Sequence, residues 1–187
     1  MHEENHRLFV YRIDLEDRIS FVNDEWIAFG IENGLTELSE KRVIGKSLWD
    51  FIADSSVQHV YEALFNRVRA KNCRPKIPYR CDSPDCRRIM EMELFSSQDG
   101  EIEITSRILK KEFRPPVSIL EHSADRSSVF LPICSFCKKM RLREDTWYEI
   151  EDAAAILGIT NIGPYPQLSH SICDRCLEDW EKNLSLL

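Results

Sequence analysis

Two pairs of cysteines in the last third of the chain constrain its fold more than any other feature. The pairs are Cys134-Ser-Phe-Cys137 and Cys173-Asp-Arg-Cys176. A CxxC unit places two sulfur atoms close enough to bind one metal ion, and two such units supply the four thiolates of a closed tetrahedral site. The intervening residues, 138–172, are long enough to hold a helix. We therefore expect a small, metal-stapled helical module in this part of the chain.

The ligand set favours zinc, because tetrahedral thiolate sites suit this metal and need no assembly machinery. An iron–sulfur cluster is the alternative. His170 lies three residues before Cys173 and is also a metal-binding residue type. It either replaces one cysteine as a ligand or donates a hydrogen bond to a thiolate, and we favour the second role. A thioredoxin-like redox centre is disfavoured, because neither pair lies in a βαβ setting.

Composition and charge describe a folded chain. The 187 residues are 43% hydrophobic and 30% charged, with a net charge of −7. The first residues contain no apolar signal core and no run has the length of a membrane span, so we expect a cytoplasmic protein that does not insert into membranes. The acidic balance makes nucleic-acid binding through residues 138–143 the less favoured alternative.

The N-terminal part has the pattern of an α+β fold. Two strands are expected at 8–13 and 19–22, followed by a short helix capped by Asn23 or Asp24. A longer helix, capped by Ser55 or Ser56, has one buried stripe at helical spacing: Val57, Val60, Tyr61, Leu64 and Val68. Three more strands are marked by apolar alternation at 77–81, 90–94 and 102–108. This order predicts one antiparallel sheet backed by helices.

Two further helices are predicted in the C-terminal part. Thr146-Trp-Tyr-Glu149 has the form of a capping box that opens a helix, whose buried face would carry Trp147, Ile150, Ala154 and Leu157. After the second cysteine pair, a terminal helix carries an apolar stripe of Leu177, Trp180 and Leu184. Such a stripe is typical of core packing, with a dimer contact as the alternative.

With these elements in order, residues 7–112 resemble a PAS sensory domain. The resemblance rests on Val43-Ile-Gly-Lys-Ser-Leu-Trp-Asp-Phe-Ile52 before the long helix, and on Tyr79-Arg-Cys-Asp-Ser-Pro84 followed by Arg87-Arg88-Ile-Met90, which is similar to small bacterial PAS proteins without an attached kinase. It implies a five-stranded sheet that cups a ligand pocket and a domain that relays signals or dimerises. The C-terminal part resembles a tail of bacterial sensor proteins, here Ile133-Cys-Ser-Phe-Cys-Lys-Lys139, Trp147 and His170-Ser-Ile-Cys-Asp-Arg-Cys176.

The pocket implied by this resemblance would be lined by Met90, Met92 and Leu94 of the sheet with Tyr61 and Leu64 of the long helix. A plain hydrophobic sheet face is the favoured alternative for the three strand residues. Neither haem nor flavin is supported. His59 falls on the side of the helix opposite its apolar stripe, and the short helices contain no cysteine.

Cys81 and Cys86 bracket a turn-forming sequence, Asp82-Ser-Pro-Asp85. If the turn closes a hairpin, the two sulfur atoms could form a disulfide or a redox pair. The favoured interpretation is two ordinary, partly buried residues.

These patterns divide the chain into three segments: a PAS-like domain at 7–112, a linker at 113–130 with Pro115-Pro116, and a four-cysteine module at 131–187. No phosphate-binding glycine loop or nucleophile with an evident base is present, so we expect no enzyme activity. The predicted function is sensory: the protein would bind a small ligand or a protein signalling partner, as a homodimer. A redox sensor that releases its metal on oxidation is the alternative.

Overall fold

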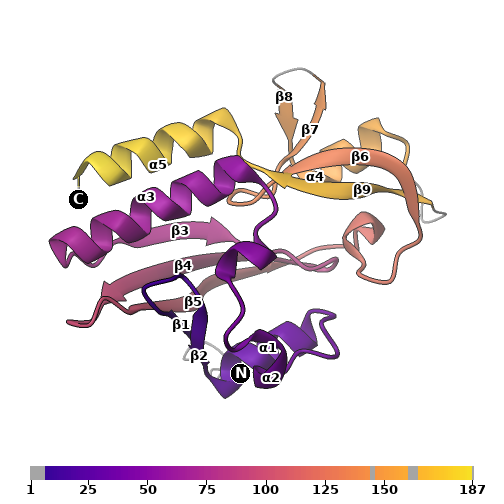
Figure 1. The fold of residues 1–187 in the computed structure, drawn as a ribbon. Coiled ribbons are helices and arrows are strands. Elements are labelled where there is room, and N and C mark those ends of the chain that lie inside the picture. Colours follow the sequence, from indigo (N-terminus) through magenta and orange to yellow (C-terminus); the bar gives the residue numbers. More distant parts are fainter. Residues whose placement is uncertain (1–6, 144–145, 160–163, 187) are drawn as a thin grey trace.

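The N-terminal half is built on a five-stranded antiparallel sheet (Figure 1). The computed structural model describes residues 7–143, 146–159 and 164–186. The strands lie in the order β2-β1-β5-β4-β3. Their bounds are β1 (Leu8–Ile13), β2 (Ile19–Val22), β3 (Lys76–Arg80), β4 (Cys86–Ser96) and β5 (Ile102–Phe113). The predicted fold class, a five-stranded antiparallel sheet with flanking helices, is therefore confirmed.

Four helical segments connect β2 to β3. They are α1 (Asp24–Glu32), α2 (Glu40–Val43), the 3-10 segment η2 (Leu48–Phe51) and α3 (Ser55–Lys71). The long helix α3 begins at Ser55, and its cap is Asp54 rather than the predicted Ser55 or Ser56, because the Asp54 carboxylate accepts hydrogen bonds from the amides of Ser56 and Val57. It ends at Asn72, which adopts the left-handed conformation with φ of 48°. No helix in the described ranges is long and apolar enough to cross a membrane.

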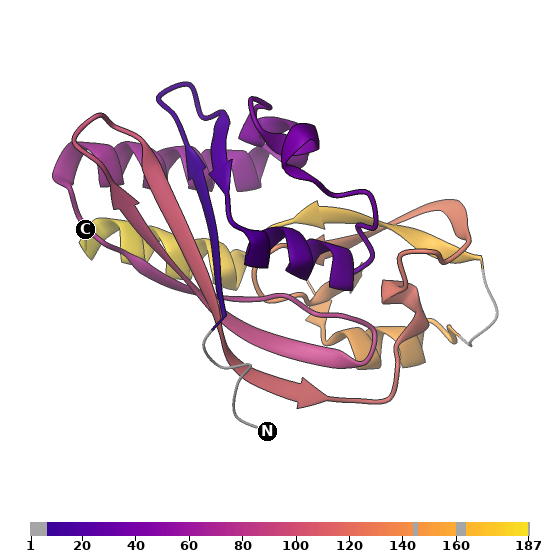
Figure 2. The ribbon, with the colours of Figure 1, turned by 90° about the horizontal axis from the view of Figure 1, so that it is seen from below.

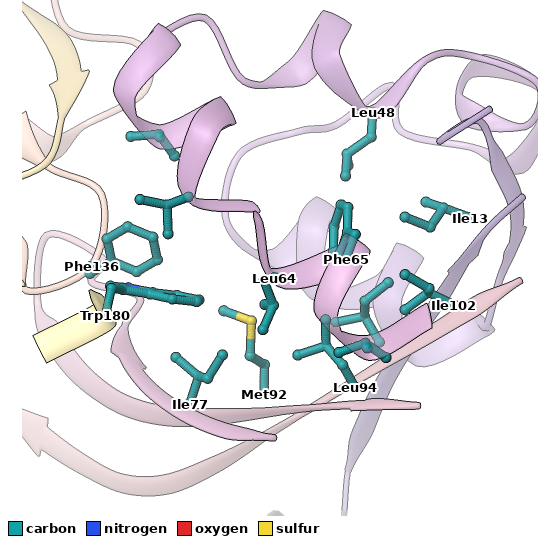
Figure 3. Close-up of a cluster of buried hydrophobic side chains, with 14 of the residues drawn as sticks. Ile13, Leu48, Leu64, Phe65, Ile77, Met92, Leu94, Ile102, Phe136 and Trp180 are labelled. Carbon is teal, nitrogen blue, oxygen red and sulfur yellow. The ribbon is translucent and has the colours of Figure 1, made fainter. Parts of the chain in front are cut away.

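The apolar stripe predicted for α3 is packed against the sheet. Its buried residues are Val57, Val60, Leu64, Phe65 and Val68. They join Ile13, Leu94 and Ile102 of the strands in one hydrophobic cluster (Figure 3). Tyr61 is only partly buried and lies at the edge of this cluster. The periodicity of the sequence thus located the helix face that forms the N-terminal core.

A second sheet, which the sequence did not predict, forms the C-terminal half. Its strands, in the order β8-β7-β6-β9, are β6 (Arg126–Cys134), β7 (Met140–Arg143), β8 (Thr146–Tyr148) and β9 (Tyr165–Ser171). Strands β6 and β9 run parallel, with Cys134 opposite Ser171. Two helices, α4 (Ile150–Ile156) and α5 (Asp174–Leu186), complete this half.

The predicted capping box at 146–149 is wrong. Thr146 and Trp147 pair with Arg143 and Arg141 of β7, so these residues are extended and form β8. Helix α4 begins only at Ile150, and Leu157 lies beyond its end and is exposed. Cross-strand pairing therefore overrides the local capping preference at this position.

The segment 113–130 carries structure of its own. Strand β5 extends to Phe113, the 3-10 segment η3 (Ser118–Leu120) follows, and β6 begins at Arg126. Ile119 is fully buried in a second hydrophobic cluster with Leu131, Ile133, Met140 and Ile150. The bounds of the two domains stay a prediction, but the chain between them is packed rather than extended.

The main hydrophobic core extends from the first sheet into the C-terminal half. Helix α5 lies beside α3 in both views (Figures 1 and 2). Its Trp180 is 4% exposed and belongs to the same buried cluster as Leu64, Ile77 and Met92. Figure 3 shows the Trp180 ring next to Phe136, between α5 and these side chains. The apolar stripe predicted for the terminal helix therefore packs within its own chain.

A network of ion pairs joins the two halves at a second place. Arg80 at the end of β3 contacts Glu149, which precedes α4, with an N–O distance of 2.7 Å. Arg114 contacts Glu151 in α4 at 2.5 Å. Both arginines also contact Asp82, whose side chain is only 1% exposed. These pairs hold α4 against the end of the first sheet.

Replacing Trp180 by alanine tests the importance of the shared core. We expect the Trp180→Ala change to lower the free energy of unfolding by about 3–5 kcal/mol, because a large buried ring is removed from a packed site. Phe130→Ala is the control, since Phe130 is 63% exposed, and it should cost less than about 0.5 kcal/mol. Urea unfolding followed by circular dichroism measures both, and equal losses would contradict the shared core.

Candidate metal centre and adjoining cavity

The four cysteines of the two CxxC units come together at one point. Their sulfur atoms all lie within 4.8 Å of one another. The sulfur atoms of Cys137 and Cys173 are 3.7 Å apart. Four sulfur atoms at about 2.3 Å from a central zinc ion form a tetrahedron with edges of about 3.8 Å. The arrangement therefore fits a single four-coordinate metal ion.

Backbone hydrogen bonds fix the first pair in a tight turn between β6 and β7. The amide of Lys138 donates to the carbonyl of Cys134 at 3.0 Å, and the amide of Cys134 donates to the carbonyl of Lys139 at 2.8 Å. Lys138 takes the left-handed conformation, with φ of 59°, which closes the turn. Both sulfur atoms of this pair are thus directed by local backbone geometry.

The second pair lies at the start of α5. Cys173 immediately precedes the helix and Cys176 lies in its first turn. The amide of Ser135 donates to the carbonyl of Ser171 at 2.7 Å, which joins the two pairs through the backbone. The amide of Cys173 also lies 3.5 Å from the sulfur of Cys134 and donates to it. Donors at a helix N-terminus stabilise thiolates, the form in which cysteine binds metals.

The four thiols perturb one another through hydrogen bonds. Those from Cys137, Cys173 and Cys176 lower the pKa of the Cys134 thiol, whereas hydrogen bonds from neighbouring cysteines raise the pKa of Cys137 and Cys176. Lys138 directs its ammonium group to the carbonyl of Ser135 at 2.8 Å, so it stays close to the first pair. Lys139 forms an ion pair with Glu149 at 3.8 Å and is drawn toward α4.

His170 does not join the group of four ligand atoms. It lies in β9 opposite Ile133 and is exposed. Its role as a donor to a thiolate or as an alternative ligand stays a prediction.

A cavity of about 140 Å³ lies between the first sheet and helices α1 and α3. Six aromatic residues line it: Phe9, Tyr11, Trp26, Phe29, Tyr61 and Tyr79. Met90, Met92 and Ser106 contribute from the central strands. The alternation of residues in β1 and β3 places Phe9, Tyr11 and Tyr79 on the inner face of the sheet, whereas the other three rings come from α1 and α3. That alternation was the signal in the sequence that could have identified the three strand residues.

The residues predicted to line a pocket divide between three places. Tyr61, Met90 and Met92 line the aromatic cavity. Leu64 instead lines a separate cavity of about 120 Å³, together with Ile77 and Trp180 at the contact with α5. Leu94 is fully buried in the core and lines neither cavity.

Tyr61 connects the aromatic cavity to the cysteine cluster. Its ring centroid lies 6.0 Å from that of Phe136, which lies between Cys134 and Cys137 in the chain, and 6.0 Å from that of Trp180. The Phe136 and Trp180 centroids are 4.9 Å apart. The carbonyl of Phe136 accepts a hydrogen bond from the amide of Arg80 at 2.7 Å. Phe136 was missed from the sequence, and Trp180 was predicted only as part of an apolar stripe, because only the fold brings the two rings to α3.

Cys81 directly follows β3 and Cys86 is the first residue of β4, and neither forms a disulfide. The amide of Cys81 donates a hydrogen bond to the carbonyl of Arg88, whereas the backbone of Cys86 forms hydrogen bonds with that of Ser83. Cys86 is therefore not the residue directly across the hairpin from Cys81. Burial is the main cause that raises the pKa of the Cys81 thiol. A redox role for the two cysteines stays a prediction.

No protein-family model and no curated protein matches the sequence. Among solved structures, the chain is similar to a sensory box sensor histidine kinase from Vibrio cholerae (9% identity, 57% of this chain and 85% of that chain, TM-score 0.42). It is also similar to the PAS domain of an HTR-like protein from Haloarcula marismortui (22% identity, 57% and 90%, TM-score 0.37) and to the PAS domain of BvgS from Bordetella pertussis (15% identity, 61% and 80%, TM-score 0.38). The likeness to PAS domains noted in the sequence is thus also found among solved structures.

Metal content distinguishes the clustered cysteines from the others. We expect the purified protein to retain about one metal ion per chain, and the Cys176→Ser variant to lose it during gel filtration, because three thiolates and a hydroxyl bind far more weakly than four thiolates. Cys73→Ser is the matched control, since Cys73 is a free cysteine outside the cluster. Elemental analysis measures both, and loss of metal from the control would contradict the assignment.

Proposed function

We propose that this chain is a non-enzymatic sensory protein. In this proposal, the N-terminal domain binds a small molecule in its aromatic cavity. Ligand binding changes the surface of the C-terminal module, which is held together by a metal ion and contacts a protein partner. The fold class supports the first part, and the geometry of the four sulfur atoms supports the second. A closed site of four thiolates leaves no position for a substrate, which supports a structural role for the metal.

The main support for the proposal is that Tyr61 contacts two parts of the molecule at once. Its side chain lines the aromatic cavity and also packs against Phe136 and Trp180. Protein interiors are close-packed, so a ligand that displaces the Tyr61 ring must also displace its neighbours. Those neighbours belong to the turn of the first cysteine pair and to α5. Occupation of the cavity would therefore alter the surface of the module.

Zinc is the metal that we propose for the four cysteines. The sulfur–sulfur distances match a single tetrahedral ion, and zinc favours thiolate sites of this form. None of the seven cysteines forms a disulfide, which supports the cytoplasmic location that we propose for the protein. A homodimer remains part of the proposal, as PAS-like domains commonly form dimers.

Contacts made by the basic side chains after the first cysteine pair favour a protein over a nucleic acid as the partner. Lys139 is paired with Glu149, and the guanidinium group of Arg141 lies over the ring of Trp147 at 5.6 Å. Side chains engaged in this way are less available to phosphate groups. The net charge of −7 acts in the same direction.

The identity of the metal is tested on protein purified without added metal. We expect about one zinc ion per chain and a colourless sample, since zinc has no partly filled d shell. Iron with a broad absorption band in the visible region would instead identify a cysteine-bound cluster and contradict the zinc assignment. Elemental analysis and an absorption spectrum of the same sample separate the two results.

A redox sensor is the alternative function, favoured by the gathering of four thiolates at a partly exposed site. Mild peroxide distinguishes the two functions. The structural role predicts that the zinc content and the oligomeric state stay unchanged. Release of zinc that is reversed by a reductant, accompanied by a change of oligomeric state, would support the redox sensor and overturn the structural role.

A further inference from the structure

We propose that the aromatic cavity binds an uncharged molecule that has a single aromatic ring and one hydrogen-bonding substituent. The inference rests on the proposed function, in which this cavity is the sensing site, and it names the class of ligand. Four properties of the cavity carry it: its volume, the rings that surround it, the hydroxyl groups that meet in it, and the lack of charge in its lining.

The volume sets the size of the ligand. The cavity measures about 140 Å³. A cavity of about 150 Å³ with an apolar lining is large enough to bind benzene. One six-membered ring with a small substituent therefore fills this space, whereas a dinucleotide, a haem or a flavin is several times too large.

The lining favours an aromatic ring over an aliphatic one. Phe9 and Phe29 have centroids 4.4 Å apart, and Tyr11 and Trp26 have centroids 6.3 Å apart, so the walls present both ring faces and ring edges. Edge-to-face and offset contacts add to the gain from apolar burial. The thioether groups of Met90 and Met92 also line the cavity, and sulfur makes favourable contacts with ring edges.

Hydroxyl groups supply the polar contact. Tyr11, Tyr61 and Tyr79 line the cavity and lie close enough that, in addition to burial, an ionised Tyr61 or Tyr79 would raise the pKa of Tyr11. Ser106 lines the cavity beside Tyr79. Burial raises the pKa of Tyr79, and a hydrogen bond between Tyr79 and Ser106 is a smaller cause that lowers it. Since a hydroxyl both donates and accepts, such a pair can add a third hydroxyl or a ring N–H from a ligand. A ligand with a purely hydrocarbon ring would form no hydrogen bond with these hydroxyl groups.

The electrostatics of the lining disfavour an ionic ligand. Within the described chain, the residues that line the cavity carry no charged side chain. Burial raises the pKa of Tyr61 to about 12, which shows that the site opposes negative charge. A cation would meet ring faces but no carboxylate, so it would lose its hydration without a counter-charge. A neutral ligand avoids both costs.

Methionine methyl groups provide a direct test with a built-in control. The chain has four methionines; Met90 and Met92 line the cavity, while Met140 is buried in the second cluster. In protein with ¹³C-labelled methionine methyl groups, phenol should shift the Met90 and Met92 resonances through its ring current and leave Met140 unchanged. Toluene, cyclohexanol, benzoate and tetramethylammonium are the comparison probes, and phenol should bind most tightly.

Removing one hydroxyl tests the polar contact. Tyr79→Phe keeps the ring but loses the hydroxyl, so we expect it to weaken phenol binding about fivefold, as for one net hydrogen bond, and to leave toluene binding unchanged. Tyr148→Phe is the control, because Tyr148 packs in the second cluster. Equal loss of phenol affinity in both variants would remove the assigned role of Tyr79.

The possible failures are distinguishable. If benzoate, tetramethylammonium or cyclohexanol shifts Met90 and Met92 at lower concentration than phenol, the ligand class is wrong, but the cavity remains a binding site and the proposed sensory function stands. If none of the five probes shifts these resonances, the cavity does not take ligands of this size, and both the ligand class and the sensing role of the cavity are overturned.

Discussion

The junction of the two cysteine pairs is the constraint on which the C-terminal half depends. Cys134 and Cys137 belong to the turn that carries Phe136, which backbone hydrogen bonds close, and Cys173 and Cys176 lie at the start of α5. Trp180 then lies one helical turn beyond Cys176, because residues four apart share a helix face. The C-terminal half has its own hydrophobic cluster around Ile119, Leu131 and Met140, and the cysteine cluster lies where that half meets the rings of Phe136 and Trp180.

The ion pairs around Asp82 make a second contact between the N-terminal and C-terminal halves, and this contact is ionic. A carboxylate that is 1% exposed would be costly to bury alone, but here it lies between Arg80 and Arg114. The same arginines reach Glu149 and Glu151 at the start of α4. Breaking one such pair leaves a buried charge without a partner, so this contact specifies how the halves fit together more than it adds net stability. The aromatic contact at Trp180 supplies the apolar part of the attachment.

Local patterns in the sequence were sufficient for the elements that depend on nearby residues. The spacing of Val57, Val60 and Leu64 located α3 and its buried face, and the two CxxC units identified the residues that gather at the cluster. The second sheet was missed because its edge strand β9 pairs in parallel with β6, more than thirty residues away in the sequence. Thr146 to Glu149 was misassigned for the related reason that β7, not the local sequence, determines its conformation. Likewise, no local pattern could place Phe136 against Tyr61.

Helix α3 is covered on two sides, and this arrangement gives the chain a route between its two sites. One side packs on the first sheet through Leu64 and Phe65, while Tyr61 meets Phe136 and Trp180. The hydrophobic core therefore crosses the boundary that the sequence places near residue 130. Coupling between two sites is carried by side chains that pack against one another along the way. Tyr61 lines the cavity and also contacts Phe136 in the turn of the first cysteine pair. In the proposed function, a change at either place reaches the other through the Tyr61 ring, which contacts both.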